Sequence, residues 1–240
     1  MPVLRDRHFY PPLSALPSGY AIIKSQQGGN HSSVLNVTSI KEVLHMYVQV
    51  RTSSGITLVP MDTRLLAERK IFIEGEITQE KACDFIKSVM LLCRENSSLP
   101  IDVLINSPGG EISSGLLMYD CIQSCETPIR MFCMGKAYSM GALLFASGSH
   151  GRFMLPHSEL MLHEPLLGSR VGGNASSLRS ISDSLMETRS RMNQILARHT
   201  GKSEREIEEA TCYDHYFSPE ESVAFGLADE IVDFSTLMEG

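Results

Sequence analysis

Short apolar stretches alternate with helical patterns from about residue 63 to the end of the chain. The stretch 101–106 is almost continuously apolar, as in a strand buried in a parallel sheet. Over 81–93 and 113–124, apolar residues recur at helical spacing. Repeated strand–turn–helix units predict an α/β fold with helices packed on a layered sheet. Further strands are expected at 70–75, 129–134, 152–155 and 160–163, and further helices after Ser139 and over 175–199.

The first 62 residues follow a different pattern. Turn-forming clusters such as Pro11-Pro12 and 26–33 interrupt residues 1–45, which we expect to be a poorly ordered N-terminal extension or a removed propeptide. Two short strand patterns flank a turn within 46–62 and predict a hairpin. The domain 63–240 then carries the α/β pattern.

Charge and composition exclude several classes of protein. The formal net charge is −7 without a long basic run, so we expect no nucleic-acid partner. No stretch reaches the roughly 18 apolar residues that cross a bilayer, and the N-terminus lacks a secretory pattern, so we expect no membrane association. The six cysteines lack the spacing of a zinc site. We interpret them as reduced, buried thiols of a cytoplasmic protein.

One serine lies between a predicted buried strand and the start of a predicted helix. Ser139 has small neighbours at Ala137 and Gly141, which let a substrate backbone approach. At the N-terminus of a helix, backbone N–H groups and the helix dipole stabilise an oxyanion. Local sequence alone favours the alternative that Ser139 is an ordinary helix N-cap, because serine is a preferred cap.

Five motifs that occur in a fixed order favour a catalytic role for Ser139 over that of a helix cap. Together they resemble the ClpP-type family of ATP-dependent serine peptidases, over about Val59 to Ile231. The resemblance implies the ClpP/crotonase-type spiral of ββα units, with a protruding handle helix and an N-terminal axial hairpin at 46–62. The motifs are Ser107-Pro108-Gly109-Gly110, Met134-Gly135 with Ala137 and Ser139-Met140-Gly141-Ala142, Leu155-Pro156-His157-Ser158, Met161-Leu162-His163-Glu164-Pro165, and His199-Thr200-Gly201-Lys202-Ser203.

The resemblance also implies roles for individual residues. Ser139 matches the family's nucleophile, His163 its base and Asp214 its acid. Gly110 and Met140 match the positions whose backbone N–H groups form the oxyanion hole. These roles agree with general chemistry, because histidine exchanges protons near neutral pH and an acid fixes its tautomer.

Alternatives to this assignment come from neighbouring residues. Three other histidines are alternatives to His163 as the catalytic base, namely His150, His157 and His215. Lys136 is a further alternative, as the base of a serine–lysine dyad with Ser139. The sequence also departs from the family. Tyr138 replaces a small residue and is expected to narrow the pocket, and Glu164 replaces a glutamine beside His163. The loop 147–152 is one residue short. Asp102 replaces an aromatic residue of the docking pocket for the ATPase.

The family's assembly supplies the remaining expectations. The resemblance implies a homo-tetradecamer of two heptameric rings, in which the 175–199 helix is the handle between rings. Unfolded polypeptides would be delivered by an AAA+ unfoldase of the ClpX, ClpA or ClpC kind, since this chain has no phosphate-binding G-x-x-x-x-G-K-[ST] loop. We expect no cofactor and no metal. Two other functions stay open: a non-catalytic subunit of a mixed ring, and a crotonase-type acyl-CoA enzyme that shares the fold.

Overall fold

The computed structural model describes residues 47–53, 55–168 and 172–238. The chain divides into two compact units, Met1–Leu58 and Val59–Gly240. In the first, strands β1 (Tyr47–Thr52) and β2 (Gly55–Pro60) form a two-stranded sheet, and the Thr52 hydroxyl donates to the Gly55 carbonyl (3.1 Å) across the turn. The expected extension 1–45 lies outside the described residues.

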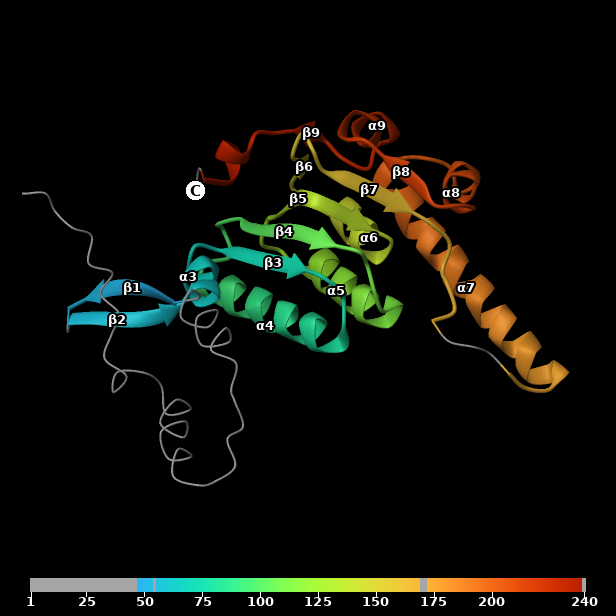
Figure 1. Ribbon diagram of the computed structural model, residues 1–240, viewed down its shortest axis with the longest axis horizontal. Coiled ribbons are helices and arrows are strands. Elements are labelled where there is room, and N and C mark those ends of the chain that lie inside the picture. Colours follow the sequence, from blue (N-terminus) through green and yellow to red (C-terminus); the bar gives the residue numbers. More distant parts are fainter. Residues whose placement is uncertain (1–46, 54, 169–171, 239–240) are drawn as a thin grey trace, which may run out of the picture. The chain divides into compact units, whose positions relative to one another are not determined.

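The second unit is built on a sheet whose strands run in the order β3-β4-β5-β6-β9 (Figure 1). All pairs along this order are parallel, as the sequence predicted for an α/β fold. Strand β7 pairs in parallel with the end of β5, and β8 pairs antiparallel with β7. The strands are β3 (Lys70–Glu74), β4 (Ile101–Ser107), β5 (Ile129–Tyr138), β6 (Arg152–Met154), β7 (Glu159–Leu162), β8 (His215–Phe217) and β9 (Glu230–Ile231).

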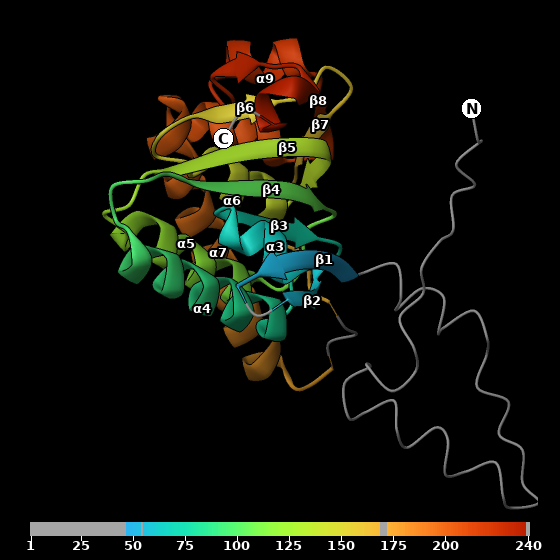
Figure 2. The same ribbon diagram turned by 90° about the vertical axis from the view of Figure 1, so that its left-hand side faces the viewer.

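Helices connect these strands and cover the sheet. Helices α4, α5 and α6 lie on one face of β3, β4 and β5 (Figures 1 and 2). This is the arrangement that parallel strands with helical crossovers require. The helices are α3 (Met61–Ala67), α4 (Gln79–Glu95), α5 (Ile112–Ser124), α6 (Met140–Ala146), α7 (Ala175–Thr200), α8 (Glu204–Thr211) and α9 (Pro219–Phe225), followed by a 3-10 helix at Phe234–Met238.

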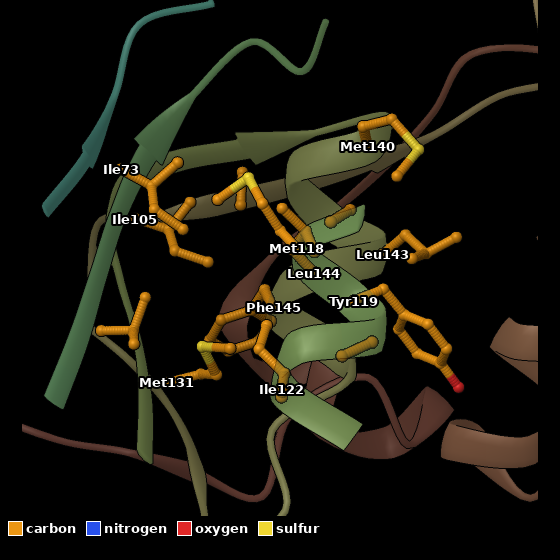
Figure 3. Close-up of a cluster of buried hydrophobic side chains, with 14 of the residues drawn as sticks. Ile73, Ile105, Met118, Tyr119, Ile122, Met131, Met140, Leu143, Leu144 and Phe145 are labelled. Atoms are coloured by element: carbon orange, nitrogen blue, oxygen red, sulfur yellow. The ribbon is translucent and has the colours of Figure 1, made fainter. Parts of the chain in front are cut away.

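The two faces of the sheet bury unequal numbers of side chains. Along β4, Val103 and Ile105 point into the main core under α5 and α6, and Leu104 points to the opposite face. In the main core, Met118 and Ile122 of α5 meet Leu144 and Phe145 of α6 (Figure 3). Each fully buried side chain of this size contributes about 1.5–3 kcal/mol. The opposite face holds the smaller cluster of Leu104, Phe132 and Leu237.

Strand β5 is longer than its sequence pattern predicts. The prediction ended the strand before Gly135, a residue with φ +94° that favours a turn. The strand instead continues to Tyr138 because its last residues gain a new partner, with Lys136 beside Glu159 and Tyr138 beside Met161 of β7. The register with β4 shifts at this point. The extension carries the chain directly to Ser139.

The long helix α7 is anchored by its C-terminal half only. Its buried residues, Met192, Asn193, Ile195 and Leu196, all lie in the last third of the helix. The N-terminal part runs beyond α4, α5 and α6 (Figure 1). Asn174 caps it by accepting a hydrogen bond from the Ser177 amide, and Gly201 ends it in the left-handed conformation. Of the helices described, none has the length and apolar character needed to cross a membrane.

Candidate active site

Ser139 lies at the junction of β5 and α6 in a strained backbone conformation. Its φ is +54°, and the only other non-glycine residue with positive φ in the described part of the chain is Arg69. Such a conformation costs about 1–3 kcal/mol. The Ser139 side chain makes no capping hydrogen bond, so the ordinary N-cap interpretation does not describe it. The hydroxyl therefore remains available for chemistry.

Backbone hydrogen bonds hold this junction on both sides. The Ser139 amide donates to the Met161 carbonyl of β7 (2.8 Å), and the Ser139 carbonyl accepts from the Leu143 amide of α6 (3.1 Å). The Met140 side chain is fully buried against Gly115 of α5, where a Cβ would lie 2.2 Å from the Met140 Cε. The strand, the helix and the neighbouring helix thus fix the orientation of Ser139.

Two glycines after β4 are closely packed, Gly109 against Ser139 and Gly110 against Ile77. A Cβ on Gly109 would lie 2.8 Å from the Ser139 Cβ and 3.2 Å from the Met140 amide nitrogen. A Cβ on Gly110 would lie 2.3 Å from the Ile77 carbonyl oxygen. The Ile77 amide donates to Gly109 (2.8 Å), and its carbonyl accepts from the Glu111 amide (2.9 Å). Only glycine fits at these two positions.

The amides of Gly110 and Met140 are among the N–H groups of the described residues that have no protein acceptor. Within the described residues, neither the Gly110 amide nor the Met140 amide donates a backbone hydrogen bond. Met140 is the first residue of α6, where amides have no intrahelical acceptor. Preorganised N–H donors beside a serine hydroxyl are the arrangement that stabilises a tetrahedral oxyanion.

Strand pairing brings His163 and Asp214 to the same edge of the sheet. Leu162 of β7 pairs with His215 of β8 in an antiparallel ladder. The next position along that ladder therefore places His163 opposite Asp214. His163 Nδ1 lies 4.0 Å from Asp214 Oδ1, which is an ion-pair contact longer than a hydrogen bond. His163 is mostly buried, with 14% of its side chain exposed, whereas Asp214 is 63% exposed. Among the described residues, no hydrogen bond joins Ser139 to His163.

The alternative residues have other contacts or surroundings. His157 is exposed in a turn, and His150 accepts or donates a hydrogen bond with Ser149 (2.8 Å). His215 stacks on Phe217 with ring centroids 4.1 Å apart. The Lys136 ammonium lies over the Tyr138 ring at 5.4 Å from its centroid. Among the described residues, none of these side chains forms a hydrogen bond or ion pair with Ser139.

Tyr138 is held to one side of the nucleophile. Its hydroxyl donates to the Glu159 carboxylate, and its ring meets Tyr216 edge-on at 5.7 Å. The hydrogen bond with Glu159, followed by burial, raises the Tyr138 pKa to about 12. The hydroxyl therefore stays protonated through the physiological range.

Glu164 has a partner that the sequence did not reveal. Its carboxylate pairs with Arg189 of α7 (3.1 Å), and the same Arg189 nitrogen pairs with Glu208 of α8 (2.7 Å). Arg189 is largely buried, with 18% of its side chain exposed, and its Nε has no hydrogen-bond partner among the residues that the structure describes. Arg189 thus ties the residue after His163 to the helix that precedes Asp214. Nothing in the local sequence around Arg189 signals this role, because the three residues meet only in the fold.

A parallel sheet that carries a serine on a strained strand-to-helix turn is typical of serine hydrolases. Comparison with protein families narrows the class: the model of the Clp protease family matches residues 54–235. The chain therefore belongs to the Clp protease family, whose members are serine proteases. The described residues include no group of three or more histidine, cysteine, aspartate or glutamate side chains arranged to hold a metal ion.

Proposed function

We propose that this chain is a serine endopeptidase that cleaves unfolded polypeptides through an acyl-enzyme. Ser139 attacks the peptide carbonyl while His163 takes its proton, and Asp214 holds the imidazole and stabilises its charged form. The amides of Gly110 and Met140 bind the oxyanion. His163 then gives the proton to the leaving amine, and water hydrolyses the ester on Ser139 in the reverse sequence.

The observation that carries this proposal is the environment of Ser139. Its backbone is strained, its hydroxyl is not used as a cap, and the two unpaired amides lie on the adjacent segments. A serine with a purely structural role gives no reason for such strain. The 4.0 Å separation of His163 and Asp214 is compatible with catalysis, since catalytic hydrogen bonds are often long until substrate binds.

Assembly into a chamber is the second part of the proposal. We infer a homo-tetradecamer of two heptameric rings, with the N-terminal part of α7 between the rings. Exposed apolar side chains support this, because Leu178 and Met186 on α7 and Leu166 and Leu167 before it remain accessible. A mass measured under native conditions tests it, and a lasting monomer would exclude the chamber.

An AAA+ unfoldase would deliver the substrates to such a chamber. The smaller cluster on the opposite face of the sheet supports a docking surface, since Met134, Phe153 and Leu155 are partly exposed around the buried Phe132, on which Phe153 stacks (4.9 Å). Asp102 makes this surface partly charged through a bidentate pair with Arg130 (2.6 and 2.8 Å). The presence of this ion pair predicts a partner loop with a polar residue next to its apolar anchor.

The decisive experiment replaces the nucleophile. Ser139→Ala is expected to lower cleavage of an unstructured peptide by roughly 10⁵–10⁶-fold, to background, and to abolish labelling by a fluorophosphonate. Ser149→Ala, in an exposed loop, is the matched control and should retain both activities. Labelling at another serine in the Ser139→Ala variant would overturn the assignment. An inactive wild-type chain that gains no label would favour the non-catalytic subunit instead.

A further inference from the structure

Two cysteine thiols meet between the ends of α4 and α5. Cys93 lies near the C-terminal end of α4, and Cys125 is the C-cap of α5. Their Sγ atoms are 3.2 Å apart, although the residues are 32 positions apart in the chain. A disulfide requires about 2.05 Å, so the two sulfur atoms need to approach by only about 1.2 Å.

The surroundings let a small reagent reach this pair. Both side chains pack against the main core and both remain partly exposed. Two other cysteines differ: Cys133 is buried, which raises its pKa to about 12, and Cys212 is exposed. Cys121 lies one turn before Cys125 and close enough to interact electrostatically with both thiols of the pair, although burial is the main reason that its pKa is raised to about 11. The short sulfur–sulfur contact is the one between Cys93 and Cys125.

Hydrogen bonds fix the backbone around both thiols. Arg69 donates to the carbonyls of Leu92 (3.1 Å), Leu99 (2.8 Å) and Pro100 (2.9 Å), which anchors the end of α4 next to Cys93. The Cys125 amide donates to the Ile122 carbonyl (3.4 Å). Because these bonds hold the backbone, the remaining approach of the two sulfur atoms would come from rotation of the two side chains.

We propose that Cys93 and Cys125 form a reversible disulfide when the protein meets a hydroperoxide. One thiolate attacks the O–O bond, becomes a sulfenic acid and releases water after protonation. The second thiol displaces a second water as the S–S bond forms, so two thiols and one hydrogen peroxide give one disulfide and two waters. A dithiol reductant restores both thiols by exchange.

The disulfide closes a segment that carries part of the candidate active site. The loop between Cys93 and Cys125 contains β4, the Gly109-Gly110 turn and α5. Cross-linking a loop of this length restricts the unfolded chain, and we expect the midpoint of thermal unfolding to rise by roughly 5–10 °C. Burial, followed by the hydrogen bond with Cys93, raises the pKa of Cys125, so the reaction should be slow at neutral pH and faster near pH 9.

The experiment treats the full-length chain with hydrogen peroxide, blocks the free thiols under denaturing conditions and maps the peptides by mass spectrometry. The number of blocked thiols should fall from six to four, with a link between Cys93 and Cys125, and dithiothreitol should reverse it. Because no Lys or Arg lies between residues 95 and 129, one tryptic peptide holds both Cys121 and Cys125. The mapping is therefore repeated in a Cys121→Ser background, where the number of blocked thiols should fall from five to three and the link should be kept.

Matched variants decide between the outcomes. Cys121→Ser should keep both the link and the thermal shift, whereas Cys93→Ser and Cys125→Ser should lose both. Oxidation of Cys93 to a sulfinic acid without a link, a link that is lost in Cys121→Ser, or a link to Cys212 would overturn the proposal. None of these readouts uses peptidase activity, so the result is independent of the proposed catalytic function.

Discussion

The two sides of the candidate active site differ in how rigidly the fold fixes their residues. On the nucleophile side, Gly109, Gly110, Ser139 and Met140 come from β4, β5 and α6, and each is fixed by close packing or backbone hydrogen bonds. On the acid–base side, His163 and Asp214 follow β7 and precede β8, two short strands at the edge of the sheet, and they meet at 4.0 Å.

Acyl transfer places a different requirement on each side. Oxyanion donors stabilise a transition state only if they are oriented beforehand, so the fold must fix them. A histidine and its acid can close when substrate arrives. On the proposed mechanism, the fold thus fixes the nucleophile side in advance, and the acid–base side is the one that substrate would close. Four substitutions test this comparison.

The largest effect is expected at Asp214. Asp214→Asn removes the charge that stabilises the imidazolium and lets His163 adopt the wrong tautomer, so kcat should fall by about 10³–10⁴-fold. The measurement is the kcat for an unstructured peptide. Asp233→Asn, another exposed aspartate near the C-terminus, is the control. A loss smaller than tenfold would remove Asp214 from the mechanism and leave the acid–base side without its acid.

The next effect is expected on the nucleophile side at Gly110. In Gly110→Ala the new Cβ clashes with the Ile77 carbonyl, so the amide shifts and kcat should fall by about 10²–10³-fold. Gly201→Ala is the matched control, because Gly201 also has positive φ (+71°) but has no atom within 4 Å of the added Cβ. The control should lose about 1 kcal/mol of stability and no activity. Equal kcat in Gly110→Ala and wild type would show that this side is not fixed as described.

A smaller effect is expected at Arg189, which supports the acid–base side. Arg189→Met leaves Glu164 and Glu208 unpaired, and we expect kcat to fall about tenfold with little change in KM, because substrate contacts are untouched. Arg189→Lys should recover part of the loss. Arg205→Met, which breaks an exposed pair with Glu209 on α8, should leave kcat unchanged. A change in KM alone would contradict a positioning role.

The smallest effect on activity is expected at Tyr138, where Tyr138→Phe should change kcat less than about threefold, since its hydroxyl points to Glu159.

The Tyr138 pKa of about 12 lies above the unfolded value of about 10, so the stability that this group contributes is present below about pH 10 and is lost as pH rises toward 12. Subtracting the alkaline absorbance titration of Tyr138→Phe from that of wild type isolates this group. Glu159→Gln should lower its pKa, and an unchanged pKa would contradict the assigned cause.

Elements with strong local patterns were predictable from the sequence. The apolar run of β4 and the helical periodicity of α5 and α7 gave bounds close to those observed. Two helices after α7 were not predicted, although their capping boxes are visible in the sequence: Ser203 with Glu206 opens α8, and Ser218 with Glu221 opens α9. A search for that spacing would have found both.

Features that depend on distant partners could not be predicted. The end of β5 is fixed by β7, and the pairing of Leu162 with His215 decides where Asp214 lies. Local sequence favoured a cap at Ser139, and its backbone conformation and unused hydroxyl emerge only in the fold. The thiol contact of Cys93 with Cys125 likewise joins two helices whose patterns contain no sign of it.

The order of the strands along the chain has a consequence for synthesis. The strands that carry the nucleophile and the oxyanion amides leave the ribosome first, β7 with His163 follows, and β8 with Asp214 comes only after α7 and α8. Because chains begin to fold from the N-terminus while they are made, a nascent chain would hold a strained serine but no acid. On the proposed mechanism, a nascent chain therefore lacks a complete triad until the segment with Asp214 has been made.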